Sequence, residues 1–279
     1  MPPTLLCVHP HPDDESIACG GVLARAAAAG ARTVVVTCTG GEEGENLAGI
    51  DLGGESLAEH RRRELADALD VLGVEGRYRL GYRDSGMAGE AANDHPASFH
   101  RADLDEAAGA LAVIVRCERP DVVVSDDAQG TYGHPDHVKA HHVTARAVAL
   151  AADPHADLAA APFAVPKRYV HTLSRSRARQ VHRALLAAGL ASPFGDGAEP
   201  AFGTDDAAVG TRVDVRPWLG RKRAAMAAHA SQIGPDSFFL NTPQEVFATL
   251  FGTEEFVRQG VSPTDDAEDD LFDGVTAVR

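Results

Sequence analysis

Short apolar segments alternate with amphipathic segments through the first 150 residues of the chain. Strands are predicted at four places, residues 4–9, 31–39, 77–81 and 121–126, most of them as near-continuous apolar runs. Segments with apolar residues at helical spacing follow them, at residues 16–30, 56–73, 103–120 and 134–152. Apolar strands that alternate with helices predict a parallel sheet covered on both faces, which is a Rossmann-like three-layer α/β fold.

The pattern becomes less regular toward the C-terminus. A loop rich in Ala and Pro at 151–166 precedes one more predicted strand, "KRYVHTLS" at 167–174. We therefore expect a Rossmann-like core over residues 1–175 and a smaller, irregular C-terminal portion over 176–279 that closes over the active site. An acidic stretch near the end, residues 264–274, is expected to be mobile or solvated.

Three polar segments follow predicted strands directly. They are "HPHPDDES" (9–16), "GGEEGE" (40–45) and "DAQGTYGHPDH" (127–137). In doubly wound sheets ligands bind beyond the carboxyl ends of the strands, so these segments should meet on one rim. Imidazoles and carboxylates together suit Zn²⁺ or Fe²⁺. The candidate donors are His11, Asp13 and Asp14 in the first segment and His134, Asp136 and His137 in the third.

Taken alone, "HPHPDDES" has a simpler interpretation. Prolines and acidic residues before a helix also form turns and complement the helix dipole, with Ser16 as a helix N-cap. The presence of "GHPDH" after a later strand favours the metal site over this interpretation. His9 is expected to be a buried strand-end histidine rather than a ligand.

Composition narrows the class of partner. The net charge of −15 disfavours binding to nucleic acid or to an anionic membrane, and a small polar molecule fits better. No apolar run approaches the roughly 20 residues of a membrane span, and no signal peptide is visible. The four cysteines are scattered, as expected for reduced thiols in the cytoplasm. The sequence leaves open whether the protein forms a homo-oligomer.

The two motifs "HPDDES" (11–16) and "GHPDH" (133–137), in this order, resemble those of the LmbE/PIG-L family of zinc-dependent deacetylases. The similarity is greatest to the branch that deacetylates N-acetylglucosaminyl-inositol in mycothiol biosynthesis, through "TCTGGEEGE" (37–45), "YRDSGMAG" (82–89) and "YGHPDHVKAH" (132–141). This resemblance implies a hydrolase that removes an N-acetyl group from an amino sugar with bound Zn²⁺, or Fe²⁺ as the alternative. The resemblance is strong over residues 5–150 and weak over the rest of the chain.

The resemblance also implies a role for individual residues. The metal ligands would be His11, Asp14 and His137, with Asp13 as general base. His134 would protonate the leaving amine or stabilise the oxyanion, Tyr132 would polarise the amide carbonyl and Asp136 would orient a histidine. Contacts to the sugar and inositol hydroxyls would come from Glu45, Arg61 and Asp84.

Three alternatives stay open. A mycothiol S-conjugate amidase shares both motifs, but typically carries a lysine shortly after the first one, where this chain has "SIAC" (16–19). A deacetylase of another amino-sugar natural product is the second alternative. A non-catalytic metal-binding relative is the third, and the presence of both Asp13 and His134 argues against it.

Overall fold

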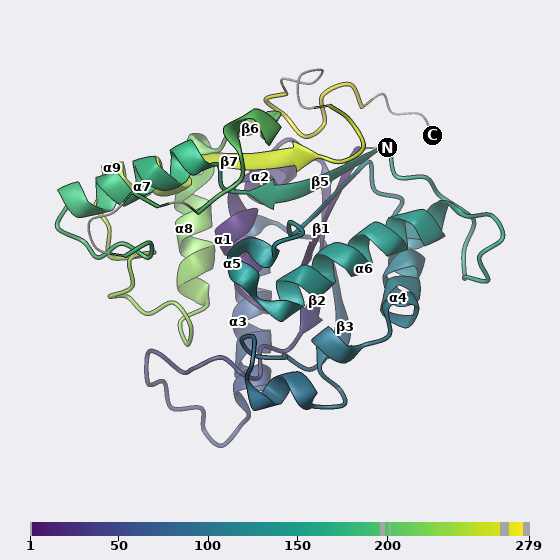
Figure 1. The fold of residues 1–279 in the computed structure, drawn as a ribbon, viewed down its shortest axis with the longest axis horizontal. Coiled ribbons are helices and arrows are strands. Elements are labelled where there is room, and N and C mark those ends of the chain that lie inside the picture. The colour runs from purple at the N-terminus through teal and green to yellow at the C-terminus, as the bar shows by residue number, and fades with distance from the viewer. Residues whose placement is uncertain (1, 196–198, 201, 263–267, 276–279) are drawn as a thin grey trace.

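A seven-stranded sheet forms the centre of the computed structural model, which describes residues 2–195, 199–200, 202–262 and 268–275 (Figure 1). The strand order is β3-β2-β1-β4-β5-β7-β6. Five strands pair in parallel: β1 (Thr4–His9), β2 (Arg32–Thr39), β3 (Gly76–Tyr82), β4 (Val122–Ser125) and β5 (Lys167–Thr172). Two later strands, β6 (Thr211–Asp214) and β7 (Thr253–Arg258), extend this sheet in antiparallel pairing.

The strand β1 shows why the sheet is covered on both faces. All six of its residues are buried, and successive side chains point to opposite faces of a strand. Leu5 and Cys7 pack with the residues of one core cluster, and Leu6 and Val8 pack with those of the other. The two clusters are the two helix–sheet layers that the apolar strand pattern predicts.

Helices fill both layers. On the Cys7 face lie α1 (Asp14–Ala18), α2 (Gly20–Ala28), α3 (Leu57–Leu72) and α8 (Leu219–Ala228). On the opposite face lie α4 (Leu104–Glu118) and α6 (Pro135–Ala152). The helices α7 (Arg175–Ala187) and α9 (Gln244–Phe251) pack on each other at the β7 side (Figure 1). Short turns complete the chain: α5 (Gly130–Gly133), η1 (Ala91–Asp94), η2 (Phe99–Arg101), η3 (Asp206–Ala208) and η4 (Arg216–Trp218).

Local sequence signals explain where helices begin and end. Ser56 and Glu59 form a capping box at the start of α3, and Gly73 ends that helix in the left-handed conformation at φ 81°. The predicted helix over 16–30 is instead two helices, because Cys19 leaves helical geometry between α1 and α2. The expectation that Ser16 is an N-cap was wrong: it is buried inside α1 and its hydroxyl donates to Glu15.

The predicted strands of the first 175 residues are confirmed, and the C-terminal portion is more regular than expected. Its strands β6 and β7 belong to the same sheet as the core. Where the boundary between core and C-terminal portion falls, and whether that portion closes over the site, stay predictions. Over the described residues, none of the helices combines the length and apolar character needed to cross a membrane.

Glu254 of β7 fastens the C-terminal portion to the core. Its carboxylate accepts hydrogen bonds from the amides of Gly21 and Val22 at 2.7 and 2.8 Å, at the start of α2. It also pairs with Lys222 of α8, and both side chains of this pair are almost fully buried. A Cβ at Gly21 would lie 2.7 Å from the Glu254 carboxylate and 2.5 Å from Val215, so glycine is required for this close approach.

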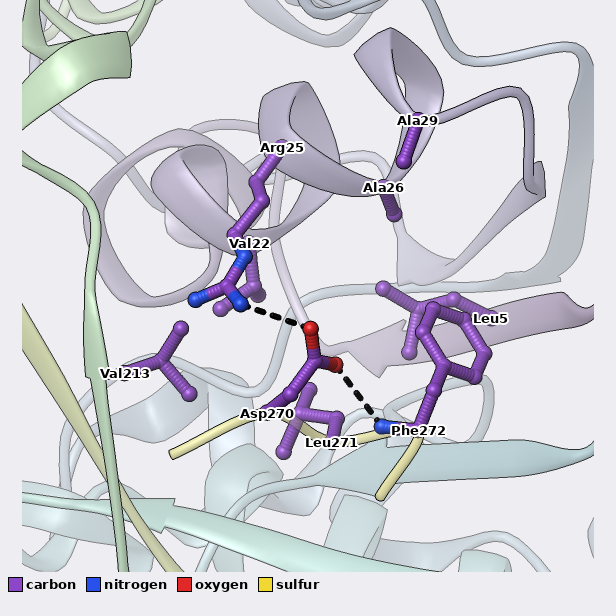
Figure 2. A pocket seen from close by; sticks show the side chains of 9 residues that line it. All are labelled: Leu5, Val22, Arg25, Ala26, Ala29, Val213, Asp270, Leu271 and Phe272. Atoms are coloured by element: carbon purple, nitrogen blue, oxygen red, sulfur yellow. Dashed lines mark hydrogen bonds and ion pairs between the residues drawn. The ribbon is translucent and has the colours of Figure 1, made fainter. Parts of the chain in front are cut away.

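The acidic stretch near the C-terminus divides in two. Residues 263–267 lie outside the described residues, and residues 268–275 pack against the core. Figure 2 shows Asp270 paired with Arg25 of α2 at 2.6 Å, with Leu271 and Phe272 beside Leu5. Leu271 is buried. Leu271 is therefore packed, whereas Asp269, Asp273 and Gly274 are exposed, so the expectation of a solvated stretch is wrong only for part of it.

Arg116 of α4 supports the end of α6 and the loop after it. It is buried, and its guanidinium donates to five backbone carbonyls, those of Leu150, Ala151, Asp153, Leu158 and Ala160. We expect Arg116→Met to lower the free energy of unfolding by about 2–3 kcal/mol, since one buried and four part-buried carbonyls lose their donor. The control Arg146→Met removes an exposed ion pair with Asp105 and should cost less than about 1 kcal/mol. Urea denaturation of both variants measures the difference, and equal losses would contradict this role.

Candidate active site

The polar segments after β1 and β4 meet at one end of the sheet. The rings of His11, His134 and His137 each place a nitrogen within 4.8 Å of the others. The carboxylate of Asp14 lies between two of these rings, 3.4 Å from His11 Nδ1 and 3.6 Å from His137 Nε2. The parallel sheet brings them together because the carboxyl ends of β1 and of its neighbour β4 share one edge.

The tautomer of His137 is set by Asp126. His137 Nδ1 lies 2.6 Å from the Asp126 carboxylate, which is fully buried, and His171 Nε2 lies 3.0 Å from the same oxygen. The two histidines hold the pKa of Asp126 well below its usual range, although burial opposes this. The carboxylate therefore accepts, and Nδ1 of His137 carries the proton. His137 Nε2, on the opposite side of the ring, is buried without a hydrogen-bond partner and is therefore the nitrogen that an ion could bind.

Asp136 orients the other ring. Its carboxylate lies 3.3 Å from His11 Nε2, and it is itself held by the amide and the hydroxyl of Ser85. Asp84 lies 3.4 Å from the same nitrogen. Burial opposes protonation of His11, but Asp136, Asp14 and Asp84 outweigh it and raise its pKa. The histidine thus presents Nδ1 toward Asp14.

These observations test whether a metal fits. An unpaired nitrogen of His137, the Nδ1 of His11 and the Asp14 carboxylate converge, and carboxylates behind His11 make the region strongly negative. Charge from His137 and His11 keeps the pKa of Asp14 well below its usual range, against the effect of burial, so Asp14 is ionised. Two imidazoles and a carboxylate are a ligand set for Zn²⁺ or Fe²⁺. The residues present fit such an ion.

Asp13, which precedes the candidate ligand Asp14, has an unusual backbone. Its φ is 116°, a conformation that non-glycine residues rarely adopt and that costs free energy. Its amide donates to Glu15 Oε2 at 3.0 Å, and its carboxylate accepts from Arg61 at 3.2 Å. Burial raises the pKa of Asp13 to about 6, although Arg61 opposes the rise. A pKa near the working pH suits a general base.

A buried ion pair fixes Glu15 in turn. His229, from the segment after α8, places Nε2 2.8 Å from Glu15 Oε1, and both side chains are fully buried. A residue 214 positions away along the chain therefore holds the loop that carries Asp13. This connection was missed from sequence, because "AHASQ" (228–232) has no local feature that identifies its partner.

His134 caps the helix α6 with its ring. His134 Nδ1 accepts the amide of Asp136 at 3.1 Å, so the proton of the neutral ring is on Nε2. Burial, together with the charges of His11 and His137, lowers the pKa of His134 to about 4. Tyr132, at the mouth of the site, is 57% exposed, and its ring centroid lies 5.3 Å from that of His137. The preceding residue, Thr131, has a φ of 60°.

The three residues predicted to contact substrate occupy different environments. Asp84 is buried beside His11. Arg61 is only 3% exposed, and its guanidinium donates to the carbonyls of Pro12 and Gly41 as well as to Asp13. Glu45 is exposed on the loop after β2, and its carbonyl accepts a hydrogen bond from Gln232 at 2.8 Å. Arg61 thus supports Asp13 directly, and substrate contacts by these residues stay predictions.

Comparisons with known proteins agree with this geometry. A protein-family model described as "PIG-L: GlcNAc-PI de-N-acetylase" matches residues 6–148. Two relatives, from Acidothermus cellulolyticus and Geodermatophilus obscurus, are 42% and 44% identical. The alignments cover 99% and 97% of this chain and 96% and 97% of the relatives. Both are named 1D-myo-inositol 2-acetamido-2-deoxy-alpha-D-glucopyranoside deacetylase.

Solved structures show the same fold. A conserved protein from Thermus thermophilus is 28% identical, with a TM-score of 0.59, and the match covers 91% of this chain and 94% of that one. The N,N'-diacetylchitobiose deacetylase from Pyrococcus horikoshii is 22% identical, with a TM-score of 0.62 and coverage of 99% and 87%.

A first prediction concerns Asp126. We expect Asp126→Asn to weaken Zn²⁺ binding by roughly 10–100-fold, because an amide can donate to His137 Nδ1 and so place the proton on the ligand nitrogen. Competition with a chromophoric chelator measures the affinity. Asp105→Asn, which changes an exposed carboxylate on α4, is the control and should bind as wild type does. An unchanged affinity in Asp126→Asn would show that this carboxylate does not set the tautomer.

A second prediction concerns the Glu15–His229 pair. We expect His229→Ala to lower kcat by roughly 10–100-fold while KM and metal content stay close to wild type, because Asp13 loses its support. Lys222→Met is a matched control: it breaks a buried ion pair between α8 and Glu254, and Lys222 has no contact to Asp13. Steady-state kinetics and thermal unfolding of both variants separate positioning from stability. An equal fall of kcat in both would mean that His229 acts only through stability.

Proposed function

This chain belongs to the PIG-L family of GlcNAc-PI de-N-acetylases, and from that membership and the site geometry we propose that it hydrolyses the N-acetyl amide of an N-acetylglucosamine-type substrate. The substrate that we propose is 1D-myo-inositol 2-acetamido-2-deoxy-α-D-glucopyranoside, in mycothiol biosynthesis. The observation that carries the proposal is the supported carboxylate of Asp13 beside a convergent set of two imidazoles and one carboxylate. The names of the two relatives, which align over nearly their whole length, support the substrate.

The metal site is proposed to consist of His11, Asp14 and His137. A Zn²⁺ ion there, or Fe²⁺ as the alternative, would lower the pKa of a water molecule and polarise the amide carbonyl. The chain supplies the orientation: Asp126 and Asp136 each fix one ligand ring by a hydrogen bond to its outer nitrogen. Such outer partners set the direction of the ligand lone pairs.

Asp13 is proposed to remove the proton from the attacking water. Its carboxylate adjoins the ligand Asp14 in sequence, and Arg61 and Glu15 hold its side chain and backbone. Its pKa of about 6 allows it to be ionised near neutral pH and then to hold the proton. The same carboxyl can give that proton to the leaving amine.

His134 is proposed to stabilise the oxyanion rather than to protonate the amine. Because His134 Nδ1 already accepts the amide of Asp136, the neutral ring offers an Nε2–H donor. A donor fixed by a helix N-terminus can stabilise developing negative charge without reorganising. Tyr132, which is exposed, is proposed to donate its hydroxyl to the substrate carbonyl after a side-chain movement. Asp84, Glu45 and Arg61 remain our candidates for sugar and inositol contacts.

A second function, cleavage of mycothiol S-conjugates, is favoured by one observation. An apolar cavity of about 220 Å³ adjoins the site through Thr131 and His171. Its walls include four phenylalanines, Phe194, Phe238, Phe239 and Phe251. A cavity of this kind could hold an apolar substituent on the substrate, which the deacetylase substrate lacks. The absence of a lysine after "HPDDE" still favours the deacetylase.

The location that we propose is the cytoplasm. All four cysteines are free, three buried and one exposed, which agrees with a reducing compartment.

The proposal is tested with Zn²⁺-loaded and Fe²⁺-loaded protein. The N-acetylglucosaminyl-inositol substrate should release acetate, and Asp13→Ala should lower kcat by roughly 10²–10⁴-fold with unchanged metal content. Measuring kcat/KM for an S-conjugate and for a larger N-acetyl glycoside in parallel ranks the alternatives. Full activity in Asp13→Ala would refute the base assignment. Intact metal without turnover of any of the three substrates would favour a non-catalytic metal-binding protein.

A further inference from the structure

Three side chains with metal-binding atoms gather behind the proposed active site. Cys7 and His9 of β1 and Cys19 between α1 and α2 each place a ligand atom within 4.8 Å of the other two. All three residues have no exposed surface. Cys7 and His9 are two positions apart on one strand, so they point to the same face of the sheet, and Cys19 packs over that face. No step of the proposed reaction uses them.

The ring of His9 lies against the Cys19 side chain and 5.8 Å, between centroids, from the ring of His171. Both of its nitrogens are buried, and neither has a hydrogen-bond partner in the part of the chain that the structure describes. A polar ring left in this state costs free energy, and buried polar groups normally have partners. The expectation that His9 is a satisfied strand-end histidine finds support only in the neighbouring Cys19 thiol. A bound ion would provide the missing partner.

We propose that Cys7, His9 and Cys19 bind a thiophilic metal ion, Zn²⁺ or Cu⁺, at a structural site separate from the catalytic one. Two sulfur ligands and an imidazole form a soft ligand set, which selects Zn²⁺ or Cu⁺ over harder ions. Zn²⁺ would displace both thiol protons to solvent, and its charge would balance the two thiolates. Cu⁺ would displace one proton and suits a site with only three protein ligands.

The chemistry of this cluster differs from that of the catalytic site. His11, Asp14 and His137 contain no sulfur, whereas two of the three donors here are thiols. Burial raises the pKa of Cys19, so without a metal this thiol is protonated and unreactive. Because the donors are fully buried, we expect the ion to be acquired as the protein folds and to exchange slowly.

The position of the cluster suggests what the ion would stabilise. It would join the end of β1 to the junction of α1 and α2, directly behind the segment that carries Asp13 and Asp14. On its other side, His9 lies with Asp126 and His171 in a second group of possible ligands within 4.8 Å. Asp126 in turn holds His137. The ion would therefore support both halves of the catalytic site without contacting substrate.

The first test needs no variant. The full chain is unfolded under reducing conditions and refolded with Cd²⁺, Zn²⁺ or Cu⁺, the last without oxygen, and bound metal is counted after desalting. We expect the Cd²⁺ form to show ultraviolet thiolate-to-metal charge-transfer absorption and each chain to retain one ion beyond the catalytic one. A chelator is then added, and the ion of which the protein retains more is the preferred one. Refolded protein without charge-transfer absorption overturns the proposal.

Variants then locate the ion. Cys19→Ser and Cys7→Ser should each lose one ion per chain and the absorption, whereas His137→Ala should lose only the catalytic ion. Cys38→Ser is the matched control, because Cys38 is equally buried but belongs to the cluster on the opposite face of the sheet. Absorption that survives in both cluster variants overturns the proposal. So does mass spectrometry showing a Cys7–Cys19 disulfide in place of a metal.

Discussion

The backbone of Asp13 is held at a φ of 116°, and much of the surrounding structure serves to keep it there. Two buried side chains, those of Glu15 and Arg61, bind different atoms of Asp13. Glu15 accepts its amide, and Arg61 donates to its carboxylate while also binding the carbonyls of Pro12 and Gly41. Such a conformation persists only when its environment over-determines it. The consequence is that the carboxylate of Asp13, our proposed base, is held beside Asp14, our proposed metal ligand.

Buried charges in the site are paired with one another. Asp126 joins His137 and His171, Asp136 joins His11 and Ser85, and Glu15 joins His229. A buried charge without a partner is costly, so each pair fixes the position of both members. The two proposed ligand histidines are therefore oriented before any ion binds. Asp126 and Asp136 also decide which nitrogen of His137 and of His11 is free to face the proposed ion.

The C-terminal portion contributes to the site by fastening it rather than by adding ligands. His229 holds Glu15, and Gln232 holds the carbonyl of Glu45 on the loop after β2. Glu254 binds the first turn of α2, which follows the segment of Asp13 and Asp14. Strands β6 and β7 continue the sheet, so this portion is continuous with the core. Support from residues distant in sequence explains how a short motif can hold a strained backbone.

The sequence by itself determined the alternating strands and helices and the segments at their ends. It did so because burial on both faces requires apolar strands and because a parallel sheet gathers their carboxyl ends on one edge. The motifs "HPDDES" and "GHPDH" therefore predicted His11, Asp14 and His137 as neighbours. The same reasoning could have predicted that Asp126 lies at this edge, since it follows β4 directly.

Only the tertiary structure decided which residue supports which. The Glu15–His229 pair spans 214 positions, and the pairing of His171 with Asp126 spans 45. Arg61 lies on a helix with three consecutive arginines, and only packing shows that it is the buried one that reaches Asp13. The antiparallel strands β6 and β7 are short and partly polar, so local periodicity does not reveal them. Local patterns encode burial and strand ends, whereas pairing between distant charges depends on how the layers pack.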